Sequence, residues 1–113
     1  MTTTQDPVNE VRLVGRVSGR PTTKVLPSGD EIVSVNVVVR RDAKARARSK
    51  ATVDTIECVA WTARLRSRLR KLEVGAQVEV TGSLRRRFTR TGAGATSFTS
   101  VEVATCRVVA TDD

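Results

Sequence analysis

Residues 53–88 read VDTIECVAWTARLRSRLRKLEVGAQVEVTGSLRRRF, and the spacing of the apolar residues changes twice within this stretch. At its start Ile56, Cys58 and Ala60 alternate with other residues, and this period of two is typical of a β-strand. The three side chains are small and apolar enough to face a core, so the residues between them, including Glu57, face outward. The stretch therefore begins with a strand.

The second part of this stretch has helical spacing. The apolar stripe consists of Trp61, Leu65, Leu69 and Leu72, and basic residues fill most of the positions between them. This pattern predicts a helix of about three turns. Gly75 follows the stripe closely, as is typical of the residue that ends a helix.

The period of two returns after the helix and also occurs outside this stretch. Val78, Val80 and Leu84 predict a strand, and similar runs predict strands at 8–17, 32–41 and 98–109. Gly15 within the first of these strands suggests a bend or a bulge.

Three connections are predicted between these elements. Gly and Pro residues make 18–30 a turning segment, with a short extended piece at 22–26. The segment 42–51 reads DAKARARSKA, which has no apolar stripe, so we expect a mobile basic hairpin loop there. A Gly-rich hairpin loop is predicted at 89–97.

The order of these elements indicates an all-β fold with one helix. Five strands with a helix between the third and the fourth are typical of the OB fold, a five-stranded Greek-key barrel that binds oligonucleotides. A chain of 113 residues has room for one such domain. We expect the domain at 8–110, a disordered tail at 1–7 and a short tail at 111–113.

The basic charge points to a polyanionic partner. The chain has 20 Lys and Arg residues against 12 Asp and Glu, which gives a net charge of +8. Most of the basic residues fall in three segments, 40–50, 64–71 and 85–90. Such clustering favours nucleic acid. A membrane surface is disfavoured because the amphipathic helix needs its apolar stripe for the core.

Other residue types exclude several classes of protein. No apolar run reaches bilayer length and the first ten residues are polar, so a cytoplasmic protein is predicted. The chain has no histidine, no phosphate-binding glycine loop and no nucleophile beside a base, so we expect no enzyme, no cofactor and no metal site. Cys58 and Cys106 are interpreted as core thiols, with a disulfide as the less favoured alternative.

Several segments together resemble the bacterial single-stranded DNA-binding protein family. They are NEVRLVGRVSGRP, VSVNVVVRR, VAW, LEVGAQVEVTGSLRRRF and TSVEV, and the resemblance covers 8–109. It implies an OB fold, a homo-oligomer (dimer or tetramer), and sequence-independent binding that protects single-stranded DNA in replication, repair or recombination. The chain looks like a short form without the acidic C-terminal tail, so recruitment of replication proteins through a tail is not expected.

The resemblance also implies residues that stack on bases, namely Trp61, Phe88 and Phe98. We expect a cationic trough floored by Trp61 and Phe88, although packing in the core is an equal alternative for Trp61 and a nearly equal one for Phe98. Two residues depart from the family pattern. Thr55 replaces an aromatic residue, and Glu57 stands where a neutral or basic residue would suit phosphates.

The candidate phosphate-binding residues lie at outward-facing strand positions and in the predicted hairpin loops. They are Arg40, Arg41, Lys44, Arg46, Arg48, Lys50, Arg85, Arg87 and Arg90. Because few aromatic residues are available for stacking, electrostatic contacts must supply more of the affinity, and binding should depend steeply on salt concentration. The basic residues of 64–71 are expected to be solvated or at an assembly surface. Arg12, Val14 and Arg16 face outward on the first strand, which is a plausible edge for pairing with a second copy.

Two other functions remain open from the sequence. An RNA-binding OB domain would share the basic groove and the aromatic residues. An OB module kept for protein interaction, such as a primosome-type accessory subunit or the partner of a paralogue, would fit Glu57 and the few aromatic residues.

Overall fold

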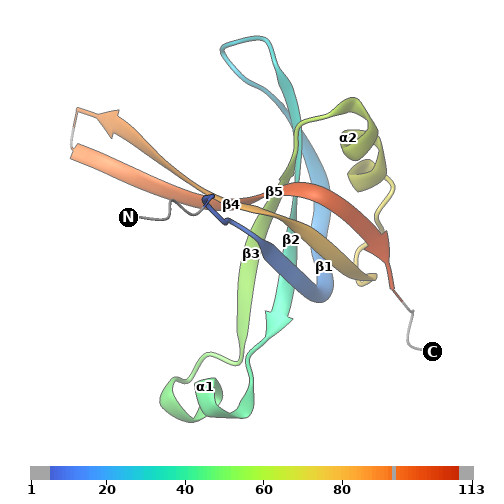
Figure 1. The fold of residues 1–113 in the computed structure, drawn as a ribbon, viewed down its shortest axis with the longest axis vertical. Coiled ribbons are helices and arrows are strands. Elements are labelled where there is room, and N and C mark those ends of the chain that lie inside the picture. Colours follow the sequence, from blue (N-terminus) through green and yellow to red (C-terminus); the bar gives the residue numbers. More distant parts are fainter. Residues whose placement is uncertain (1–5, 93, 110–113) are drawn as a thin grey trace, which may run out of the picture.

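The computed structural model describes residues 6–92 and 94–109, which form a closed five-stranded barrel in the order β1-β2-β3-β5-β4 (Figure 1). The elements are β1 (Val11–Val25), β2 (Glu31–Arg40), α1 (Ala43–Arg48), β3 (Val53–Ala60), α2 (Ala63–Arg70), β4 (Gln77–Thr91) and β5 (Gly94–Val108). All neighbouring strands are antiparallel except β3 and β5, which are parallel. This is the OB fold that the sequence predicts, with a second helix, α1, that it does not.

Strand β1 is longer than predicted because it serves both neighbours. Residues 11–16 pair with β4 and residues 16–25 pair with β2, and the register shifts between Ser18 and Thr22. The irregularity therefore lies beyond Gly15, which keeps a regular pairing with Val78 but comes so close to β2 that a Cβ would collide with the Val38 carbonyl oxygen. The expectation of a free edge strand is wrong, since the barrel closes on both sides of β1.

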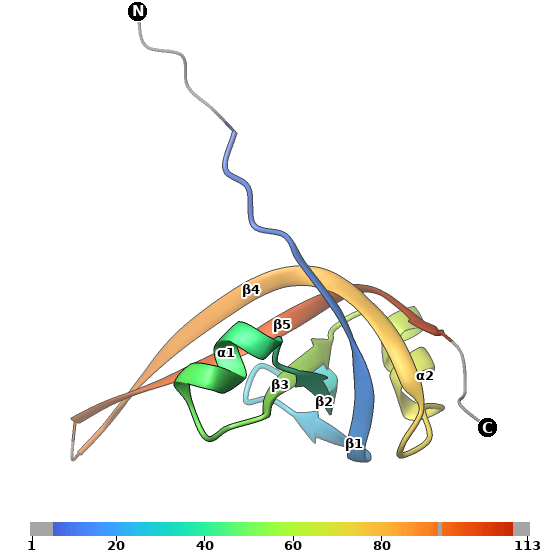
Figure 2. The same ribbon diagram turned by 90° about the horizontal axis from the view of Figure 1, so that it is seen from below.

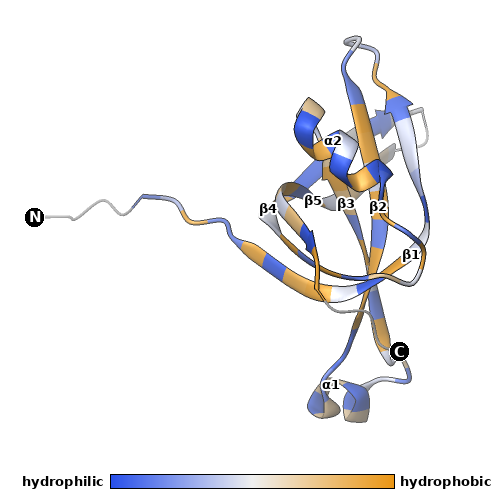
Figure 3. Cartoon of the chain, turned by 90° about the vertical axis from the view of Figure 1, so that its right-hand side faces the viewer, coloured by the Kyte–Doolittle hydropathy of each residue, from blue (hydrophilic) through white to orange (hydrophobic). Residues whose placement is uncertain are grey.

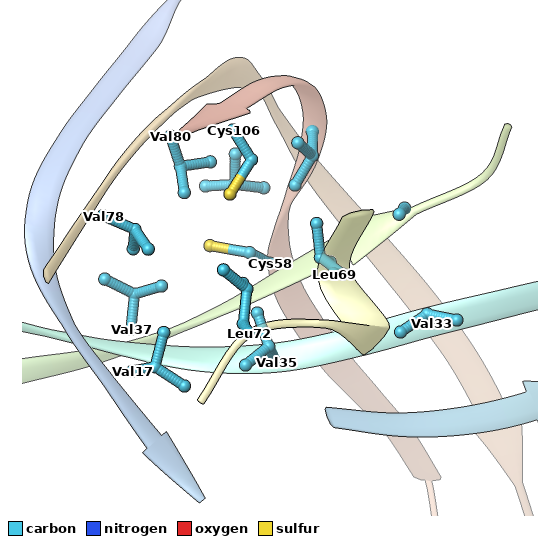
Figure 4. Close-up of a cluster of buried hydrophobic side chains, with 13 residues drawn as sticks. Val17, Val33, Val35, Val37, Cys58, Leu69, Leu72, Val78, Val80 and Cys106 are labelled. Atoms are coloured by element: carbon cyan, nitrogen blue, oxygen red, sulfur yellow. The ribbon is translucent and has the colours of Figure 1, made fainter. Parts of the chain in front are cut away.

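The predicted alternation places the core correctly. Within the barrel Val33, Val35 and Val37 of β2 are buried, and so are Cys58 and Ala60 of β3. Figure 4 shows Val33, Val35, Val37 and Cys58 in one cluster with Leu69 and Leu72, and Ala60 belongs to the same cluster. Both cysteine thiols are free and buried, as the core interpretation predicts. Figure 3 shows the resulting alternation of hydrophobic and hydrophilic bands along the strands.

Helix α2 is shorter than predicted and leaves Trp61 outside it. The side-chain oxygen of Thr62 caps the helix by accepting from the Leu65 amide at 3.3 Å, so the helix begins one residue after this cap. Gly75 then has φ +93°, and its amide donates to the Val17 carbonyl oxygen at 2.8 Å. The Leu69 side chain has no exposed surface and packs into the core of the barrel, which holds α2 in place.

The basic segment after β2 forms a helix where a mobile loop was expected. The carboxylate of Asp42 accepts from the Ala45 amide at 2.8 Å, so it caps α1. The cap stabilises the first turn of α1, which has no apolar stripe and no buried residue. The helix therefore projects from the end of β2 and β3, away from α2 (Figure 1).

The connection between β4 and β5 is also shorter than predicted. The two strands stay paired as far as Thr91 and Gly94, so most of the expected loop at 89–97 is strand. Threonine, which is β-branched, is common along both strands and favours this pairing. The paired ribbon extends well beyond the barrel in Figures 1 and 2.

The predicted tails lie largely outside the described residues, since these omit 1–5 and 110–113. The domain limits of 8–110 therefore stay a prediction at both ends. Neither helix in the described part of the chain is long and apolar enough to cross a membrane.

Candidate nucleic-acid interface

A groove of about 440 Å³ crosses the outer face of the barrel beside the β4–β5 ribbon. Its volume falls within the range of small-molecule sites, which is about 300–1,000 Å³. All five strands contribute to its lining, which consists of Thr22, Lys24, Leu26, Ile32, Ser34, Glu57, Val59, Arg87, Phe98 and Ser100. The groove therefore combines apolar residues, one aromatic ring, two cations and one carboxylate.

The floor of the groove is apolar although it lies on the outward face of the sheet. Val59 alternates with the core residues Cys58 and Ala60, yet only 3% of its surface is exposed. Ile32 is 7% exposed and lies on the neighbouring strand. The sequence pattern assigns Val59 to the solvent side, whereas in the structure it shares the groove with Ile32 and with Phe98 and Ser100 of β5.

Trp61 lies at the edge of this region with its ring partly exposed. The guanidinium carbon of Arg87 is 5.6 Å from the centroid of the Trp61 ring, a cation–π contact between the ribbon and the end of β3. Nη1 of Arg66 donates to the carbonyl oxygens of Trp61 and Glu31. These contacts hold the tryptophan half-buried at the surface, so the ring is not sealed in the core.

The two faces of the β4–β5 ribbon carry different aromatic residues. Arg87 pairs with Phe98 and Phe88 pairs with Ser97, so Phe88 and Phe98 point to opposite faces. Phe98 lines the groove, whereas Phe88 lies under Arg86, whose guanidinium carbon is 4.7 Å from its ring centroid. Phe88 is 66% exposed and Phe98 is 59% exposed. A single trough floored by Trp61 and Phe88 is therefore not what the structure contains.

Two of the nine candidate phosphate-binding residues are already paired with carboxylates. Arg41 donates from Nη2 to Asp54 at 2.8 Å, and this bond raises the pKa of Arg41. Arg85 lies 3.4 Å from Glu102. These partners weaken the case for phosphate contact at Arg41 and Arg85.

The other seven candidates are exposed and make no ion pair within residues 6–92 and 94–109. They fall into two places. Arg87 and Arg90 lie on the ribbon, whereas the remaining five lie at the end of β2 or on and after α1, namely Arg40, Lys44, Arg46, Arg48 and Lys50. The predicted phosphate contacts therefore form two groups, one on the ribbon and one at the end of β2 and on α1.

Most of the basic residues of α2 hold the helix on the barrel. Nη1 of Arg68 donates to the Cys106 carbonyl oxygen at 3.0 Å, and Arg70 forms an ion pair with Glu31. Arg66, Arg68 and Arg70 therefore contact the barrel, whereas solvated side chains were expected. Arg64 and Lys71 instead line a separate cleft of about 500 Å³ between α2 and the end of β5, away from the groove.

The outward residues of β1 lie beside a carboxylate that the sequence did not single out. Glu79 accepts from Nε of Arg107 at 2.8 Å and from Nε of Arg12 at 2.7 Å. These two bonds, the Arg107 bond above all, lower the pKa of Glu79. Val14 and Arg16 line a further cleft of about 570 Å³ that β1 forms with β2 and β3.

Lys24, Ile32 and Val59 line the groove, but sequence reasoning did not single them out as site residues. The sequence signal that could have found Lys24 is the predicted extended piece at 22–26, because it places this lysine in a strand-like segment. Thr22 and Ser34 join the two strands there through their hydroxyl oxygens, 2.9 Å apart.

The comparisons with known proteins agree with this architecture. Residues 8–109 match the single-strand binding protein family. Among solved structures, the Plasmodium falciparum SSB complex with ssDNA has a TM-score of 0.74 and 22% sequence identity, and the match covers 95% of this chain and 97% of that chain. At this identity the likeness shows the fold. No curated protein matches the chain.

Proposed function

The chain belongs to the single-strand binding protein family and binds single-stranded DNA, and we propose that it does so across the outer face of β2 and β3. The groove beside the β4–β5 ribbon carries this proposal. It offers an apolar floor, the exposed ring of Phe98 and the cations Lys24 and Arg87 in one place. Single strands are bound by this combination of stacking rings and cations.

The proposed path runs from the groove towards helix α1. Ser34 lies in the groove and Arg40 ends β2, so the path along the strand measures about 20 Å at about 3.3 Å per residue. Cations stand at both ends of this path, and sugar–phosphate contacts along it carry no sequence information. Several nucleotides can therefore be held with little dependence on sequence.

Stacking is proposed at three rings, on two faces of the ribbon. Trp61 and Phe98 act at the groove, where Arg87 already contacts the tryptophan ring. Phe88 acts on the opposite face, and a strand reaches it only by passing around the ribbon. Long oligonucleotides should use all three rings, and short ones only the first two.

The proposed cellular role is to protect exposed single strands during replication, repair or recombination, in the cytoplasm and without catalysis. The free thiols of Cys58 and Cys106 fit a reducing compartment. In this proposal, binding itself protects the single strand.

The protein is also proposed to be a homo-oligomer, a dimer or a tetramer, that uses the outward residues of β1. Val14 is exposed and lines the cleft beside Arg16, and a second copy would cover both. Light scattering of the purified protein should give a multiple of the 12.3 kDa chain mass. The Val14→Asp variant should give a smaller mass. A wild-type protein that runs as a monomer would contradict this assembly.

The test of DNA binding is a titration of Trp61 fluorescence with oligo(dT), alongside oligo(U). We expect quenching by oligo(dT) with a tighter dissociation constant than for oligo(U), since the family binds DNA. The Trp61→Ala/Phe98→Ala variant, measured with labelled oligo(dT), should bind much more weakly. The Arg64→Gln variant is the matched control, because Arg64 faces the cleft between α2 and β5. Equal affinity of the double variant and wild type would rule out the groove as the binding site.

A further inference from the structure

The carboxylate of Glu57 stands in the base-binding groove without a partner. Glu57 is exposed on β3 and lines the groove together with Phe98 and Arg87. Within residues 6–92 and 94–109 its side chain makes no hydrogen bond and no ion pair, although Lys24 lines the same groove. Its oxygen atoms are therefore available to a ligand.

The surroundings of Glu57 suit a base better than a phosphate. A carboxylate repels a phosphate group at short range, whereas the buried Val59 and Ile32, which line the same groove, are apolar. The Phe98 ring stands in the same groove and is exposed enough to stack. A base that lies on this floor or on this ring can turn its hydrogen-bonding edge to Glu57.

The chemistry of the carboxylate ranks the four bases. An ionised carboxylate only accepts hydrogen bonds, and its two oxygens match two parallel donors. Guanine offers such a pair on its Watson–Crick edge, the N1–H group and the exocyclic amino group. Adenine and cytosine offer one amino group each, whereas the single N–H of thymine lies between two carbonyl oxygens that a carboxylate repels.

From this arrangement we infer that Glu57 makes the groove a subsite that prefers guanine over the other bases and disfavours thymine. The inference rests on the proposed function, since it concerns one base position within the bound strand. Binding along the remainder of the path stays independent of sequence.

The test uses short thymidine oligonucleotides, about as long as one binding site, with one central position changed to dG, deoxyinosine, dC or dA. Inosine keeps N1–H but lacks the amino group of guanine. Wild type should bind the dG oligonucleotide about 5- to 150-fold more tightly than all-thymidine, with inosine between them. Equal affinity for dG and thymidine would overturn the inference while leaving the proposed function intact.

The variant Glu57→Gln separates the carboxylate from other causes of preference. Its amide has one acceptor and one donor group, so the preference for dG should vanish, and the affinity for all-thymidine should rise as a negative charge is lost. Glu102→Gln is the matched control, because it removes the same charge from β5 outside the groove and should keep the preference.

A Glu57→Gln protein that still prefers dG, or a Glu102→Gln protein that loses the preference, would overturn the role of Glu57. Failure of wild type to bind any of the oligonucleotides would overturn the proposed function and this inference together. Circular dichroism of both variants confirms that the barrel is folded.

Discussion

The cations at the α1 end of the proposed path should set part of the salt dependence of binding. Lys44 and Arg48 lie four residues apart on α1, so they share one side of that helix, and both are exposed. Each phosphate contact in a single strand contributes about −0.7 to the slope of log K against log salt concentration. The Lys44→Gln/Arg48→Gln variant should therefore have a slope less steep by about 1.4.

The wild-type slope follows from the same count. The cations along the path are Lys24 and Arg87 in the groove and Arg40, Lys44, Arg46, Arg48 and Lys50 at the other end. If all of them contact phosphates, the slope is about −5, and affinity falls about a thousandfold between 50 and 200 mM salt. The variant should lose roughly a hundredfold over the same range.

The assay is fluorescence anisotropy of a labelled thymidine oligonucleotide at four salt concentrations. The matched control is Arg64→Gln/Lys71→Gln, which removes the same charge from the cleft between α2 and β5. This control should keep the wild-type slope, because those cations lie off the path. If both variants change the slope equally, the net charge of the protein governs binding, and the path towards α1 is refuted.

Three further predictions concern the rings, the core and the thiols. Phe98→Ala should weaken binding of both an 8-nucleotide and a 35-nucleotide oligomer by about 5- to 150-fold, from a stacking energy of about 1–3 kcal/mol per base. Phe88→Ala should weaken only the longer one, and titrations at both lengths would expose a loss on the short oligomer as a contradiction. Leu69→Ala, which empties a fully buried site under α2, should lower the free energy of unfolding by about 2–5 kcal/mol in urea denaturation. Burial raises the pKa of Cys58 to about 12 and also raises that of Cys106, so thiol reagents at pH 8 should label neither until the protein unfolds, and rapid native labelling would contradict the buried placement.

Local patterns in the sequence account for the strands and for the helix after β3. The valines of β2 alternate because one face of a strand is buried, and that period is visible in any single sequence. Leu65, Leu69 and Leu72 show the helical period for the same reason. The barrel fold, the clustering of charge and the exposed Phe88 ring could therefore be predicted before any contact was known, whereas the sequence left Phe98 between stacking and packing in the core.

Some differences come from local signals that compete. Helix α1 forms on a cap from Asp42, although the segment has no apolar side to bury. The strands at 91 and 94 pair further than the glycines of 89–97 suggest, because their threonines favour extended backbone. In both segments the free energies of the loop and of the regular structure differ little, so residue type alone does not determine which one forms.

The binding groove itself was decided by contacts between residues far apart in the chain. The register of β4 against β5 sends Phe88 and Phe98 to opposite faces, and a shift of one residue would bring both rings to the same face. The same ribbon brings Arg87 to Trp61 and places Phe98 in one groove with Glu57 and Val59. Sequence determined which residues face outward on each strand, whereas only tertiary packing determined which of those outward residues meet, because register and barrel closure couple strands that no local period connects.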